Sequence, residues 1–156
     1  MKREPDTRHI DRQAWNDVLA LRRNILSRLD YKALFEDFRK SLRERDIVPL
    51  IDEFIDEELE TLSLLAGQLR RAGAAMPDLE EGRDRDLTFQ FRARRDPLDQ
   101  LEFLRRGAEG AAEWYEERAG DESLSEGTRA MFAGLGQWQR RRIERLDELT
   151  DRLQGR

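Results

Sequence analysis

Three residues with charged or amide side chains interrupt hydrophobic stripes of the sequence where a helix would be buried. Glu58 lies midway along a stripe with helical spacing, whose other members are Ile51, Ile55, Leu62, Leu65 and Leu69. Gln139 and Arg142 lie midway along a second stripe, whose other members are Phe132, Leu135, Leu146, Leu149 and Leu153. A buried carboxylate can bind a metal ion or pair with a guanidinium group. The chemistry of this chain therefore depends on which groups meet at these positions.

The sequence limits the metal and nucleophile chemistry that is available. It contains no cysteine, which excludes disulfides, thiolate zinc sites, iron–sulfur clusters and cysteine nucleophiles. The single histidine, His9, lies in a polar leader, residues 1–10, and is expected to be solvated. No Gly-rich phosphate loop, nucleophile elbow or catalytic triad is present. We therefore predict no catalytic and no cofactor-binding residues.

A metal site built from carboxylates alone is the alternative, and its candidates are Glu57, Glu58, Glu60, Glu109 and Glu113. Without a histidine, such an oxygen-only site suits Mg²⁺ or Ca²⁺ better than iron oxidation. Apart from Glu58, these residues lie on charged helix faces that are typical of solvated surfaces. We therefore expect them to face water.

The composition predicts one all-helical domain that comprises residues 1–156. Charged residues make up 40% of the chain and apolar residues recur with helical spacing, so the charge is expected to coat amphipathic helices. The net charge is -5 with both signs interspersed, which disfavours nucleic acids and anionic membranes as partners. No apolar run is long enough for a signal peptide or a membrane span. The predicted location is the cytoplasm.

Four helical segments are expected, over residues 11–45, 48–73 and 97–120 and from the serines at 123 and 125 almost to the C-terminus. The first segment suggests one long helix or two nearly continuous ones. Asp46 is expected to cap the second helix and Gly73 to end it, while Asp96 and Pro97 open the third helix. Four glycines fall inside the predicted helices, where they permit close helix approach or leave a small ligand cavity: Gly107, Gly110, Gly134 and Gly136.

The connection between the second and third helices, residues 72–96, is long for a loop in a compact domain. It matches a crossover that runs the length of a helix bundle. Its apolar stretch "LTFQF", residues 87–91, alternates well enough to predict a short extended piece on the helices. The predicted fold is therefore a four-helix bundle of two helix hairpins joined by a long crossover.

The two halves of the chain resemble a repeat. When Phe132 is aligned with Ile51, Gln139 falls on Glu58 and Arg142 falls on Thr61. A similar alignment of the first and third helices places Ala108 on Arg28. Each predicted helix then carries an unusual residue at the same depth of the core.

This arrangement resembles the ferritin-like superfamily, and most clearly its rubrerythrin branch. "AEGAAEWYEERAG", residues 108–120, is similar to the third-helix pattern Glu-x-x-Ala-x-x-aromatic-Tyr, and "MFAGLGQWQRRRIERLDEL", residues 131–149, is similar to the fourth helix. The resemblance implies a ferritin-like four-helix bundle in which each helix pair supplies a Glu and a Glu-x-x-His to a di-iron centre. It would place Tyr115 near the metals and leaves open whether this tyrosine has a redox role.

The chain departs from that pattern at nearly every ligand position. Ala108 and Gln139 stand where the family has Glu, Arg142 and Thr61 stand where it has His, and Arg28 occupies the expected position in the first helix. Glu58 alone matches. One carboxylate between guanidinium groups does not fit a di-iron site, which needs several carboxylates and usually imidazole.

The interpretation is a ferritin-like bundle that has lost its di-iron site and carries a core cluster of Arg28, Glu58, Gln139 and Arg142 instead. Without metal cofactors, it would act as a non-catalytic binding or assembly module, as a homodimer or with an unidentified protein partner. One alternative is a di-iron oxidoreductase or iron-handling protein with an atypical carboxylate site, and another is a helical adaptor unrelated to ferritins. In a third, Glu58 and Arg142 lie at the seam edge with their polar heads in water.

Overall fold

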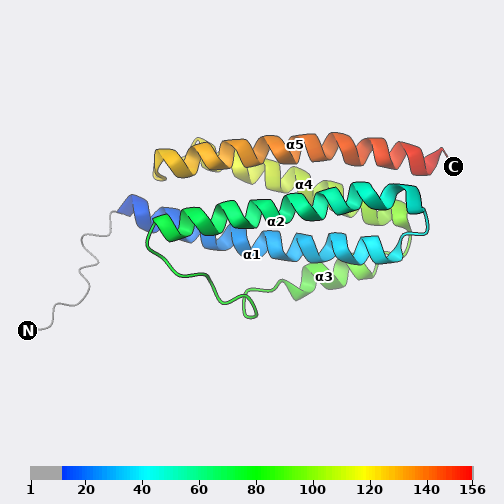
Figure 1. The fold of residues 1–156 in the computed structure, drawn as a ribbon, viewed down its shortest axis with the longest axis horizontal. Helices are drawn as coiled ribbons and strands as arrows, with labels where there is room; N and C mark the ends of the chain where they lie inside the picture. The colour runs from blue at the N-terminus through cyan, green and yellow to red at the C-terminus, as the bar shows by residue number, and fades with distance from the viewer. Residues whose placement is uncertain (1–11, 156) are drawn as a thin grey trace, which may run out of the picture.

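The computed structural model describes residues 12–155 and folds them into five α-helices, with no strand among these residues (Figure 1). Four helices are long: α1 (Arg12–Ser41), α2 (Val48–Arg71), α4 (Pro97–Ala119) and α5 (Glu126–Gln154). Helix α3 (Arg85–Arg92) is short, and a 3₁₀ turn, η1 (Arg45–Ile47), precedes α2. The predicted leader 1–10, with His9, lies outside the described residues.

The long helices pack as two hairpins, α1 against α2 and α4 against α5. A short link through η1 joins the first pair, and residues 120–125 join the second. The all-α prediction and the pairing into hairpins are therefore confirmed, although the connection between the hairpins contains a fifth helix. Within residues 12–155, no helix is long and apolar enough to cross a membrane.

A polar layer divides the apolar core into two clusters. The first contains, among others, Phe35, Phe38, Ile51, Phe54 and Leu146. The second contains, among others, Val18, Leu21, Leu65, Tyr115 and Phe132. Between them α1, α2 and α5 each bury a charged side chain, namely Arg28, Glu58 and Arg142. The interruptions of the hydrophobic stripes thus lie at one level of the bundle.

The helix ends follow ordinary capping chemistry. Pro97 lies in the first turn of α4, and the Asp96 side chain accepts a hydrogen bond from the backbone N of Leu98 at 3.0 Å. Ser125 caps α5 by accepting a hydrogen bond from the backbone N of Thr128. Gly73 has a φ of 77°, which favours glycine, directly after the end of α2.

The prediction that Asp46 caps α2 is wrong. The residue that precedes α2 is Ile47, which makes no side-chain cap, and Asp46 lies one residue earlier, inside η1. This 3₁₀ turn contains a hydrogen bond from the backbone N of Ile47 to Glu44 O at 3.4 Å. The Asp46 carboxylate instead accepts a hydrogen bond from Arg152 Nη2 at 2.9 Å and so ties η1 to the end of α5.

The prediction of an extended piece at residues 87–91 is also wrong, because these residues belong to α3. Asp84 nucleates this helix by accepting a hydrogen bond from the backbone N of Leu87 at 2.9 Å. An extended strand would place Leu87, Phe89 and Phe91 on one face. The helix instead buries Phe91, packs Leu87 against the core one turn away, and leaves Phe89 72% exposed.

The connection between the hairpins runs back beside α1 and is anchored there. In Figure 1 it leaves the end of α2, passes alongside α1 and ends in α3. The buried Asp30 of α1 accepts hydrogen bonds from Arg83 Nε at 3.0 Å and from the backbone N of Asp84 at 3.1 Å. These bonds hold the cap of α3 on α1 and so fix the position of the short helix.

Candidate functional site

The polar layer is an ion-pair cluster formed by three helices. Arg28 Nη1 of α1 donates to Glu58 Oε1 of α2 at 2.9 Å, and Arg142 Nη1 of α5 donates to the same oxygen. The exposed fractions of the three residues are 2%, 0% and 3% for Arg28, Glu58 and Arg142. The alternative in which Glu58 and Arg142 reach water at the seam edge is therefore wrong. The stripes place both residues on the buried faces of their helices, and the bundle closes over them.

Aromatic rings surround the two guanidinium groups. The Arg142 guanidinium lies 5.1 Å from the ring centroid of Phe35 and 5.3 Å from that of Phe54. The Arg28 guanidinium lies 5.0 Å from the ring centroid of Tyr31. Cation–π attraction to these rings offsets part of the cost of removing the two charges from water.

The cluster carries more positive than negative charge. Glu58 is its only fully buried carboxylate, while Glu57 lies at its edge, with Oε1 3.8 Å from Arg142 Nη2 and a side chain that is 28% exposed. Arg145, which is itself partly exposed, shares Glu57 at 3.2 Å. A metal cation would meet guanidinium groups on two sides of the buried carboxylate. The residues present therefore do not fit a di-iron site.

Several hydrogen-bonding atoms of the layer are left without partners in the described part of the chain. They are Arg28 Nε, Glu58 Oε2, Gln139 Oε1 and Arg142 Nε. An unsatisfied buried polar atom costs roughly 1–3 kcal/mol. The cluster thus retains unused hydrogen-bonding capacity in the core.

Burial and neighbouring charges shift the pKa values of Arg28 and Tyr115. Burial alone would lower the pKa of Arg28, but the charge of Glu58 and the nearby tyrosines outweigh burial, so the net shift is upward. Burial raises the pKa of Tyr115 to about 12, against the opposing charge of Arg28. The Tyr115 hydroxyl donates to Asn24 Oδ1 at 2.6 Å. At neutral pH, Arg28 is therefore charged and Tyr115 is a neutral hydrogen-bond donor.

The other residues at the expected ligand positions are also buried but do not join the ion pairs. Gln139 is 3% exposed, and no hydrogen bond connects it to Arg28, Glu58 or Arg142 in residues 12–155. Thr61 and Ala108 are 3% and 4% exposed. The structure thus brings together three of the four residues predicted for the core cluster, with Gln139 beside them rather than bonded to them.

The remaining candidate carboxylates lie elsewhere on the helices. Glu60 and Glu113 are exposed, and Glu109 pairs with Arg105 along α4. Among the described residues, no three His, Asp or Glu side chains come together as a group that could hold a metal ion. Glu57, Glu58, Glu60, Glu109 and Glu113 thus form no common metal site in this arrangement.

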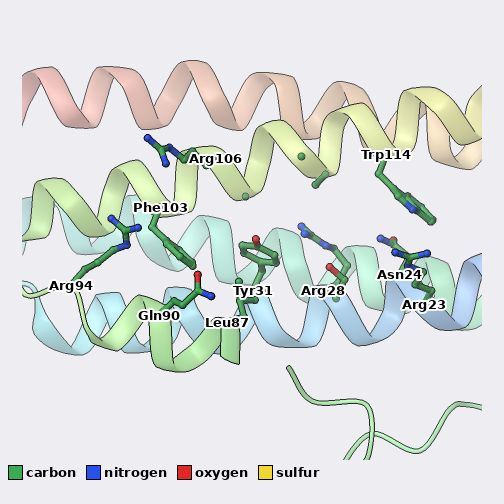
Figure 2. A pocket seen from close by; sticks show the side chains of 14 residues that line it. Arg23, Asn24, Arg28, Tyr31, Leu87, Gln90, Arg94, Phe103, Arg106 and Trp114 are labelled. Carbon is green, nitrogen blue, oxygen red and sulfur yellow. The ribbon is translucent and has the colours of Figure 1, made fainter. Parts of the chain in front are cut away.

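A pocket of about 490 Å³ lies between α1, α3 and α4, at two of the four glycines for which the sequence left a small ligand cavity open as an alternative (Figure 2). Gly107 and Gly110 of α4 line it, opposite Arg28 and Tyr31 of α1. A Cβ atom on Gly107 would lie 2.3 Å from Tyr31 Cε1, whereas a Cβ atom on Gly110 would meet no heavy atom within 4 Å. The two glycines in the helix were the only sequence signal for this cavity.

A feature that the sequence interpretation missed joins the two hairpins at their far end. The buried Asp17 of α1 accepts hydrogen bonds from the backbone N of Ser125 at 2.9 Å and from Ser125 Oγ at 2.5 Å. Because Ser125 caps α5, this contact fixes the start of α5 on α1. Nothing in the helical stripe of residues 11–45 distinguishes Asp17 from a solvated carboxylate.

Comparisons of the chain with protein-family models, with curated proteins and with solved structures found no match.

Proposed function

We propose that this chain is a metal-free helical bundle of the ferritin-like type that serves as a non-catalytic binding or assembly module. The observation that carries the proposal is the position of Glu58 between two buried arginines. In the alignment with the rubrerythrin pattern, Glu58 and Arg142 occupy positions at which that family has iron ligands. Here these positions hold an ion pair, which joins α2 to α5 and, through Arg28, to α1.

The charges support the loss of the metal site. An iron centre is held by several carboxylates that offset its charge, whereas Arg28 and Arg142 already neutralise Glu58 from two helices. To bind iron, the carboxylate would have to leave both guanidinium groups. That exchange would strand two buried positive charges, which is strongly unfavourable.

The test is iron binding by the purified chain, incubated anaerobically with ferrous iron and then desalted and measured by mass spectrometry. Wild type is expected to retain no iron above the level of the desalting blank. Glu58→Gln keeps the size of the side chain and Glu60→Gln is its exposed control, and both are expected to behave as wild type. Retention of about two irons per chain, lost in Glu58→Gln, would instead establish the alternative of a di-iron oxidoreductase or iron-handling protein.

A gain-of-function variant tests the ferritin-like part of the proposal separately. Five substitutions restore the pattern of the resembling family: Arg28→Glu, Thr61→His, Ala108→Glu, Gln139→Glu and Arg142→His. If these positions descend from iron ligands, the variant should bind iron that wild type does not. A folded variant, judged by circular dichroism, that binds no iron would count against the family assignment.

The assembly state and the location stay predictions from the sequence, namely a homodimer or a complex with a protein partner, in the cytoplasm. Trp15 and Leu19 lie one turn apart on α1 and are 49% and 50% exposed. Exposed apolar side chains of this kind are candidates for a contact with a second chain. Light scattering after size exclusion, on wild type and on a Trp15→Ser/Leu19→Ser variant, measures the mass directly. A homodimer requires a wild-type mass of twice the chain mass.

A further inference from the structure

The pocket between α1, α3 and α4 combines arginine side chains with aromatic walls. A ligand assigned to this pocket rests on the proposed function, since it specifies what a non-catalytic binding module of this kind would hold. The volume of the pocket, about 490 Å³, lies within the range of pockets that bind small molecules. The pocket also adjoins the ion-pair cluster, because Arg28 belongs to both.

Four arginines line the pocket, and no aspartate or glutamate of residues 12–155 does. They are Arg23 and Arg28 of α1, Arg94 before α4 and Arg106 of α4. Such an excess of positive charge is notable in a chain whose net charge is -5. Because like charges gathered in one concave site repel each other, they favour an anion that enters it.

Two of these arginines have free charge to offer. Arg106 already pairs with Glu102 at 3.0 Å, and Arg28 pairs with Glu58. Arg23 and Arg94 make no ion pair with the described residues, and the Arg94 guanidinium lies over the Phe103 ring, 5.0 Å from its centroid. The Nε atoms of Arg28 and Arg94 also lack hydrogen-bond partners within the described ranges. Guanidinium groups bind carboxylate and phosphate oxygens through paired hydrogen bonds.

The remaining walls suit a flat apolar group. Tyr31, Phe103 and Trp114 contribute rings, and Gly107 and Gly110 carry no side chain at two positions of the α4 wall between Phe103 and Trp114. Figure 2 shows Arg23 and Trp114 at one end of the pocket, Arg94 and Phe103 at the other, and Tyr31 between them. An aromatic ligand could therefore stack along the pocket while its acidic group reaches an arginine at an end.

We propose that this pocket binds a small aromatic anion, with its ring between Tyr31 and Trp114 and its carboxylate or phosphate group on Arg23 and Arg28. The buried ion pair keeps Arg28 fixed at the inner wall of this site. Asn24, which accepts the hydrogen bond of the Tyr115 hydroxyl, lines the same wall and so connects the site to the core.

The test is isothermal titration calorimetry of the full chain with four probes. 1-Naphthoate and 1-naphthyl phosphate carry both the ring and the charge, 1-naphthalenemethanol carries the ring alone, and inorganic phosphate carries the charge alone. At least one naphthyl anion should bind saturably, at least about tenfold tighter than both single-feature probes. The preferred naphthyl anion identifies the acid class. If neither anion binds, or if 1-naphthalenemethanol binds as tightly, the proposal is wrong.

Matched glycine variants locate the bound probe. Gly110→Leu places a side chain in the pocket, whereas Gly134→Leu places the same side chain on α5, and neither Cβ would meet a heavy atom within 4 Å. Gly110→Leu should reduce the affinity for the naphthyl anion at least about tenfold, and Gly134→Leu should leave it unchanged. Equal affinities of the two variants would place the binding elsewhere and overturn the assignment.

A second pair of variants tests the charge. Arg23→Gln removes an unpaired arginine of the pocket, and Arg141→Gln removes an exposed arginine of α5 that does not line it. Only Arg23→Gln should lower the affinity for the naphthyl anion and make that affinity depend less on the salt concentration. Failure of these experiments leaves the iron test untouched: a chain that binds neither iron nor naphthyl anions keeps the metal-free assignment and loses only this ligand.

Discussion

The Arg28 guanidinium and the Glu58 carboxylate meet in the middle of the bundle, with Arg28 Nη1 2.9 Å from Glu58 Oε1 and both side chains almost completely removed from solvent. This contact joins α1 to α2 at the level where the hydrophobic stripes are interrupted. The residues of the buried core form two apolar clusters, and the ion pair lies between them. Four predictions follow from this layer and from the helices that pack around it.

Glu58→Ala should destabilise the chain by about 3–5 kcal/mol, because it leaves Arg28 and Arg142 as buried charges without a partner. The control Glu60→Ala, on the exposed face of the same helix, should change the free energy of unfolding by less than about 0.5 kcal/mol. Urea denaturation followed by circular dichroism measures both values. Equal midpoints for Glu58→Ala and wild type would show that the ion pairs contribute nothing to stability.

Replacing the whole cluster should cost far less than removing its carboxylate. The triple variant Arg28→Met/Glu58→Leu/Arg142→Met removes all three charges at once and keeps similar side-chain volumes. Its unfolding free energy should come within about 1 kcal/mol of wild type or exceed it, as in other buried ion pairs exchanged for apolar groups. A triple variant as unstable as Glu58→Ala would indicate that the cluster determines the fold rather than being tolerated by it.

Two glycines of α4 should respond in opposite directions to the same substitution. Gly110→Ala should stabilise the chain by about 1 kcal/mol, since its Cβ has open space and alanine favours the helix. Gly107→Ala should destabilise it by about 1–2 kcal/mol, because its Cβ would lie 2.3 Å from Tyr31 Cε1 and displace that ring. Thermal melts of both variants, and of Gly107→Ala combined with Tyr31→Ala, measure this. Without the Tyr31 ring, alanine at position 107 has room, so the double variant should melt at a higher temperature than Tyr31→Ala alone.

The phenol of Tyr115 should make stability depend on alkaline pH. Its pKa is raised to about 12 by burial, whereas in the unfolded chain it is about 10. A raised pKa in the folded state means that its contribution is fully present below pH 10. This contribution is lost as the pH rises from 10 through 12. At pH 12 the loss of stability amounts to about 2 kcal/mol.

Tyr115→Phe is the variant that isolates this effect. At neutral pH it should be about 1 kcal/mol less stable than wild type, because Asn24 Oδ1 loses its donor. Between pH 10 and pH 12 its stability should fall less steeply than that of wild type, since Tyr31, whose pKa burial also raises, is present in both proteins. Parallel pH profiles from guanidinium denaturation would mean that the Tyr115 phenol is not the titrating group.

The sequence predicts the helices well because their signals are local. Apolar residues at helical spacing mark the buried faces of α1, α2, α4 and α5, and Asp96, Pro97 and Gly73 mark ends through their own backbone preferences. The stretch "LTFQF" was misinterpreted because a short apolar run fits two periods. A single hydrogen bond, from the backbone N of Leu87 to Asp84, favours the helix there.

Side-chain partners are less predictable because they depend on distances between helices. Glu58 and Arg142 could be placed in the core from their positions on the stripes. Whether Gln139 joins them could not, since that depends on how α5 packs against α2, and Gln139 Oε1 has no hydrogen-bond partner among the described residues. The partner of Asp17 is a residue more than a hundred positions away, which no helical pattern can indicate.

The amino-acid sequence by itself determined the all-helical class, the two hairpins and the polar residues that interrupt their buried faces, because each of these follows from local spacing and charge. Only the tertiary structure decided that Arg28 and Arg142 share one carboxylate oxygen of Glu58. It also decided that α3 packs beside α1, where four arginines come to line one pocket. These features require segments far apart in the chain to meet, and that meeting depends on how all the helices pack together.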